Sequence, residues 1–140
     1  MGDELAASNI NRAYALAGTS IAIFTFMLLF LYPRFANGEV DALLFQATLA
    51  VMGAATFSFV FSSFHYYVAA VGSGMDDASR ARYARWGDRF WLLGSTLLFL
   101  APSMVLVAVG LLAVGLGWFA LWVAYVLFAI RHFPRVQTGQ

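Results

Sequence analysis

The chain has no cysteine, no lysine and very few charged residues of any kind. Without cysteine there can be no disulfide, no thiolate metal site and no cysteine nucleophile. Charged types make up 11% of the 140 residues, whereas soluble domains carry about 25%. The net charge is +1, so there is no excess of positive charge of the kind that attracts nucleic acid. We therefore expect no nucleic-acid partner.

What the chain has in abundance is apolar surface. Hydrophobic types make up 62% of the residues and aromatic types 17%. A water-soluble protein of this composition could not cover its surface with polar groups. Aromatic residues also favour the membrane, because Trp and Tyr settle at its interfaces. The lipid bilayer is therefore the expected solvent and the first expected partner.

Long uncharged runs divide the chain into membrane spans. A helix needs about 20 apolar residues to cross ~30 Å of hydrocarbon. The runs predict an all-α, single-domain bundle over residues 1–140, with four transmembrane helices at about 13–31, 43–71, 90–109 and 113–131. Pro33 and Arg34 should close the first span. Gly110, Gly115 and Gly117 mark the expected tight hairpin between the third and fourth.

The charged residues are concentrated in one stretch and on one side. Residues 75–88 predict a short amphipathic helix at the cytoplasmic interface, either separate from the third span or continuous with it. Four spans would place seven of the eight arginines on the side of both termini, leaving Arg34 on the other side. The positive-inside rule then predicts a multi-pass protein of the plasma or inner membrane, with both termini in the cytoplasm.

Polar residues recur on one face of the second span and on one face of the third. In the second span these are Ser58, Ser62 and His65, at helical spacing. Arg89, Thr96 and Ser103 follow at intervals of seven in the third span. We expect these six residues to line a path for an ion, a proton or a small solute, with His65 as its titrating member. The alternative is packing, in which small residues let helices approach and each serine bonds to its own backbone.

The second span also carries the residues expected at an oligomer interface. Ala47, Ala50 and Gly53 form a strip of small residues where a partner helix could come close. Phe57 and Phe61 belong to an apolar ridge that could pack inside the bundle or against a second subunit. We therefore expect a homo-oligomer or a subunit of a larger membrane complex.

No motif points to catalysis. The two histidines are too few for a supported metal or haem site, and neither lies in a Ser-His-Asp arrangement. The chain also lacks a phosphate-binding loop and a dinucleotide fingerprint. We expect no enzyme activity, no cofactor and no metal. The leading hypothesis is an oligomeric channel or transport subunit. The alternative is a non-catalytic accessory subunit of a larger membrane complex, with a cofactor-binding membrane enzyme as a distant third.

Overall fold

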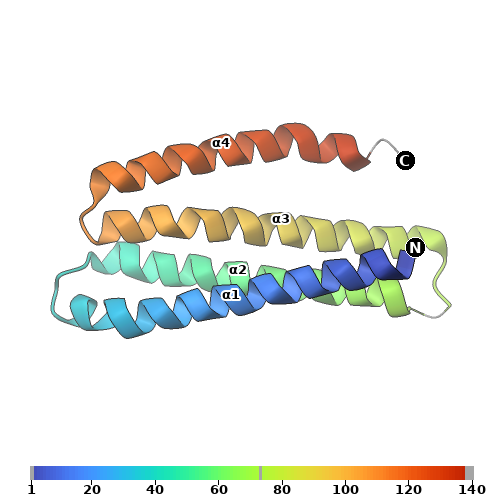
Figure 1. The fold of residues 1–140 in the computed structure, drawn as a ribbon, viewed down its shortest axis with the longest axis horizontal. Coiled ribbons are helices and arrows are strands. Elements are labelled where there is room, and N and C mark those ends of the chain that lie inside the picture. The colour runs from blue at the N-terminus through green and yellow to red at the C-terminus, as the bar shows by residue number, and fades with distance from the viewer. Residues whose placement is uncertain (1, 73, 138–140) are drawn as a thin grey trace.

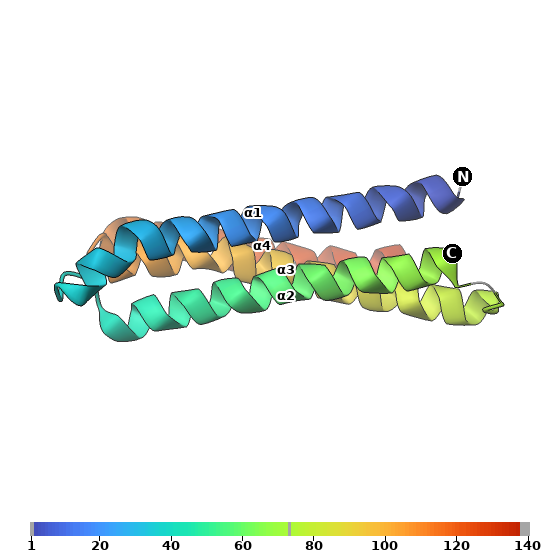
Figure 2. The same ribbon diagram turned by 90° about the horizontal axis from the view of Figure 1, so that it is seen from below.

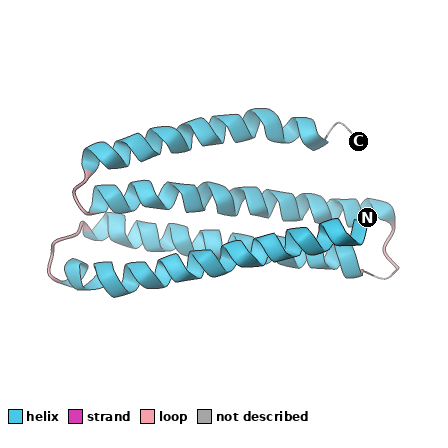
Figure 3. Ribbon diagram, in the orientation of Figure 1, coloured by secondary structure: helices cyan, strands magenta, loops and turns pink. Residues whose placement is uncertain are grey.

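The chain forms four long helices joined by short connections (Figures 1 and 3). The computed structural model describes residues 2–72 and 74–137, and the side chains of residues 7–72 and 74–131. The helices are α1 (Gly2–Ala36), α2 (Ala42–Val71), α3 (Asp77–Ala108) and α4 (Leu112–Gln137). Each contains a stretch long and apolar enough to span a membrane. The prediction of an all-α chain with four helices capable of crossing a bilayer is confirmed.

The first connection lies slightly later than the sequence predicted. Pro33 is inside α1 rather than at its end. Pro33 has no N–H to donate, but its carbonyl still accepts from Asn37 N at 3.1 Å. Gly38, with φ of 75°, then reverses the chain. The Asp41 carboxylate caps α2 by accepting from Leu44 N at 2.8 Å.

The connection between α3 and α4 consists of residues 109–111. Gly110 adopts φ of 85°, and Leu111 N donates to the Leu106 carbonyl at 2.8 Å. This bond satisfies one of the carbonyls that a helix end leaves open. Gly115 and Gly117, expected near the turn, lie inside α4 instead.

The charged stretch that follows α2 belongs to α3. The helix begins at Asp77 and continues through Phe90 into the apolar run without interruption. Residues 77–88 are therefore the first turns of α3 rather than a separate helix. The helix α3 has 32 residues and rises about 1.5 Å per residue. It is therefore longer than the ~30 Å thickness of the hydrocarbon layer. The first turns can therefore extend into the headgroup region.

Helices that follow one another in sequence pack side by side, and α4 lies on the side of α3 away from α1 (Figures 1 and 2). The start of α1, the end of α4 and the α2–α3 connection lie at one end of the molecule (Figure 1). We call this the α2–α3 end. Met27, Met52 and Ala101, from α1, α2 and α3, form a buried apolar cluster. These three helices thus share a core to which α4 is added.

Candidate functional site

The two predicted path serines of α2 are buried and hydrogen-bonded to backbone carbonyls. The Ser58 hydroxyl donates to the Ala54 carbonyl of its own helix at 2.7 Å. The Ser62 hydroxyl donates to the Gly87 carbonyl of α3 at 2.8 Å. The Ser58 bond matches the packing alternative, in which each serine bonds to its own backbone. The Ser62 bond differs from that alternative, because its acceptor lies on the neighbouring helix. Ser62 thus forms part of the α2–α3 contact.

Two of the path residues predicted on α3 belong to a different contact. The Ser103 hydroxyl is buried and donates to the Gly115 carbonyl of α4 at 2.9 Å. The Thr96 carbonyl accepts the indole N–H of Trp122 at 2.8 Å. These bonds join α3 to α4, whereas Ser62 joins α2 to α3. The structure therefore does not bring the α2 serines and the Thr96–Ser103 pair onto one shared surface.

His65 and Arg89 lie closer to the α2–α3 end. The His65 Nδ1 atom is 2.7 Å from the Phe61 carbonyl oxygen. Because a carbonyl only accepts, Nδ1 is the donor in this contact. Arg89 is exposed, with its guanidinium carbon 5.0 Å from the centre of the Trp86 ring. Stacking of this kind is a typical cation–π contact.

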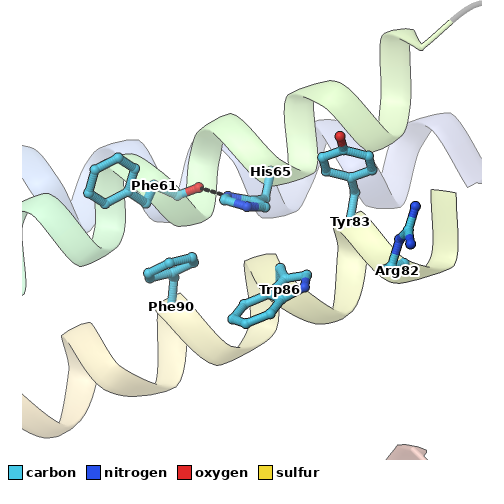
Figure 4. Close-up of a pocket in the computed structure, with 6 residues that line it drawn as sticks. All are labelled: Phe61, His65, Arg82, Tyr83, Trp86 and Phe90. Atoms are coloured by element: carbon cyan, nitrogen blue, oxygen red, sulfur yellow. Dashed lines mark hydrogen bonds between the residues drawn. The ribbon is translucent and has the colours of Figure 1, made fainter. Parts of the chain in front are cut away.

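His65 faces a groove between α2 and α3 (Figure 4). The groove has a volume of about 580 Å³ and is lined by Phe61, His65, Arg82, Tyr83, Trp86 and Phe90. We call it the aromatic groove. The His65 ring centre lies 5.1 Å from that of Phe90 and 6.0 Å from that of Tyr83. An arginine and a histidine are thus set among four aromatic rings.

A second polar group joins the first three helices and was not predicted as a site. The Tyr66 hydroxyl donates to Asp88 Oδ1 at 2.5 Å. Both residues border a pocket of about 190 Å³ together with Asn9, Arg12 and Trp91. The Arg12 guanidinium carbon lies 5.8 Å from the centre of the Trp91 ring. We call these five residues the Asp88 cluster. The available sequence signals were Arg12 and Asp88, which stand within two positions of the start of an uncharged run.

Two glycines let α2 and α3 approach closely. A Cβ atom at Gly87 would lie 2.9 Å from Cε1 of Tyr66, and one at Gly94 would lie 2.9 Å from Cε1 of Phe59. Aromatic rings of α2 therefore pack on glycine positions of α3. The seven-residue spacing of the two glycines was the available sequence signal, because it repeats on one helix face.

The predicted oligomer strip lies on the outside of α2. Phe57 is 64% exposed and Phe61 49% exposed, and Ala50 is exposed as well. Ala47 and Gly53 are partly covered, yet nothing lies within 4 Å of the position that a Gly53 Cβ would occupy. The ridge therefore faces outward, and Phe61 also borders the aromatic groove.

Among the side chains that the structure describes, no three His, Asp or Glu residues come together as metal ligands. His132 lies outside that set. Comparison with protein families, with curated proteins and with solved structures found no match to this chain. The geometry of the chain itself is therefore the basis for its proposed function.

Proposed function

We propose that the chain is a non-catalytic membrane subunit that acts by assembling with further membrane helices, supplied by its own copies or by a larger complex. The observation that carries this proposal is the position of α4. Described side-chain bonds fix α4 to α3 through Ser103 and Trp122. A strip of small residues lies on its exposed surface: Ala113, Gly117, Ala120 and Ala124.

Helical geometry places this strip opposite α3. At 100° per residue, its four positions fall within about 60° of one another. Gly115 and Trp122, which bond to α3, lie about 160–200° away from Ala113. Nothing lies within 4 Å of the Cβ position at Gly117. The α4 strip is therefore accessible to another helix.

Small residues argue for a helix partner more strongly than exposed leucines do. Lipid tails are as apolar as leucine, so an exposed apolar side chain gains little by leaving lipid. Small residues let two backbones approach, which increases van der Waals packing. The exposed Ala50 and the open Gly53 position offer a similar surface on α2. Two outward strips thus support an assembling subunit.

The second candidate is a transport subunit, and the Asp88 cluster favours it. Ionisable side chains that line a pocket between membrane helices commonly mark an ion or proton pathway. Arg12 and Asp88 border the same 190 Å³ pocket between three helices. Loss of reconstituted proton or cation flux in Asp88→Asn would support this candidate. Absence of any flux from the wild-type chain would remove it.

The assembly proposal is tested by mass measurement of the full chain in mild detergent and in lipid nanodiscs. We expect a particle larger than one chain, or a defined complex recovered after crosslinking in the native membrane. Gly117→Leu and Gly53→Leu should reduce that assembly by separating the backbones. Val114→Leu adds bulk beside the α4 strip and is the matched control. A monomer in both media, with no crosslinked complex in the membrane, would overturn the proposal.

A further inference from the structure

The aromatic groove changes in polarity along its length. Arg82 and Tyr83 line it near the start of α3, and Phe90 lines it two turns further on (Figure 4). Phe90 follows Arg82 by eight positions, which corresponds to about 12 Å along the helix axis. Phe61 faces Phe90 across the groove, with ring centres 5.6 Å apart. One end is therefore cationic and the other is apolar.

The groove also spans the boundary between the charged and the uncharged parts of α3. Charged residues occupy the helix as far as Arg89, and the uncharged run begins at Phe90. Trp86 and Tyr83 lie just before that boundary, where amphipathic rings are favoured at a membrane interface. The groove is thus at the depth where phospholipid headgroups meet acyl chains.

The charged residues around the groove determine which ligand charge it favours. Arg82 lines it, and Arg89 stacks on its Trp86 wall. Arg85 is exposed on the same turns of α3. Asp88 is hydrogen-bonded to Tyr66 in the separate pocket of the Asp88 cluster. Asp76 and Asp77 stand at the start of α3, where Asp76 interacts electrostatically with Arg82. Residues 76–89 still carry four arginines against these three aspartates. The positive charge at this end therefore complements an anionic group.

We propose that the aromatic groove binds one anionic phospholipid from the leaflet that meets the α2–α3 end. The headgroup phosphate pairs with Arg82, and the start of an acyl chain lies against Phe61 and Phe90. Basic pockets between transmembrane helices recognise anionic headgroups by this combination of charge and depth. A soluble phosphate compound would meet the charge and leave the apolar end unfilled. A zwitterionic lipid would fill the apolar end without the net charge.

The test is native mass spectrometry of the full chain in detergent, titrated with phosphatidylglycerol or with phosphatidylcholine of the same acyl chains. We expect phosphatidylglycerol to bind about tenfold more tightly and to resist competition by inorganic phosphate at equal concentration. Arg82→Gln should reduce that preference about fivefold. Arg34→Gln, which removes a charge at the opposite end, should leave it unchanged.

Phe90→Ala should weaken the binding of both lipids by the same factor, because it removes acyl contact and no charge. Equal affinity of the wild-type chain for the two lipids would overturn the proposal without recourse to any variant. Displacement of phosphatidylglycerol by inorganic phosphate, or an equal effect of Arg82→Gln and Arg34→Gln, would also overturn it. If no preference for phosphatidylglycerol is observed, the assembly proposal still stands, because the mass measurement tests it independently.

Discussion

The α2–α3 and α3–α4 contacts are built on the same bond and differ in extent. Ser62 donates to the Gly87 carbonyl across the first contact, and Ser103 donates to the Gly115 carbonyl across the second. In each case a small residue brings the carbonyl close enough for a short serine side chain to reach it. A serine facing a glycine on the next helix is therefore this protein's recurring means of joining two spans.

What differs is the packing that surrounds the bond. In the α2–α3 contact, Phe59 packs on Gly94 and Tyr66 packs on Gly87 and bonds to Asp88. In the α3–α4 contact, Trp122 adds one further hydrogen bond, Val107 packs on Gly115, and the ring centres of Phe99 and Tyr125 lie 5.1 Å apart. The opposite face of α4 stays exposed. The hydrogen bond thus sets where two helices meet, and aromatic rings packed on glycines make the α2–α3 contact the more extensive of the two.

The largest expected effect comes from filling the glycine under Phe59. Gly94→Leu would force α2 and α3 apart, and overpacking of this kind costs about 2–3 kcal/mol. We expect a corresponding loss in the free energy of unfolding, followed by circular dichroism in mixed detergent. Gly18→Leu is the control, because nothing lies within 4 Å of that Cβ position. A loss no greater than in the control would show that the close approach at Gly94 contributes little.

Loss of the hydrogen bond between Tyr66 and Asp88 should have the next largest effect on the free energy of unfolding. A hydrogen bond to a charged group contributes about 1.5 kcal/mol or more. A double-mutant cycle with Tyr66→Phe and Asp88→Asn should therefore give a coupling energy of about that size. Independent, additive effects of the two changes would mean that the bond does not stabilise the α1–α3 unit.

Replacing the two serines should have the smallest effects on the free energy of unfolding. These effects nevertheless distinguish the α2–α3 contact from the α3–α4 contact most clearly. Polar bonds between membrane helices average about 0.6 kcal/mol, so Ser62→Ala and Ser103→Ala should each cost about that much. The two contacts should differ in which connection becomes sensitive to proteolysis. Ser103→Ala, combined with Trp122→Phe, should increase proteolysis in the α3–α4 connection while α1–α3 remain folded. Equal cleavage in both connections would contradict the view that α4 is the separable helix.

The sequence predicted the helices far better than the site. Uncharged runs locate spans because burying a charge in lipid is costly, a rule that needs no knowledge of neighbours. The serines at 58 and 62 were placed correctly on one helix. Ser58 bonds within that helix, but the partner of Ser62 depends on which helix packs there. Neither the Gly87 carbonyl nor the Arg12–Asp88 pocket could be found from spacing alone. Such contacts join residues 25 or more positions apart, and only the tertiary arrangement pairs them.

The continuity of α3 also explains why the sequence left open whether residues 75–88 form a separate helix or part of the third span. Charge marked the stretch as interfacial, and that remains consistent with its position before Phe90. However, α3 contains no proline before Pro102, and its first glycine, Gly87, stays helical where Tyr66 of α2 packs on it. The helix therefore runs from the charged turns into the span.

The most direct test of the account is accessibility of single cysteines, since the native chain has none. Four crossings place Asn37 and Leu111 on one side of the membrane and Ser79 on the other. The positive-inside rule predicts that the arginine-rich α2–α3 end lies in the cytoplasm, so Asn37→Cys and Leu111→Cys should react with an impermeant maleimide in intact cells. Ser79→Cys should react only after the membrane is opened. Reaction of Asn37→Cys and Leu111→Cys from opposite sides would contradict the four-span architecture.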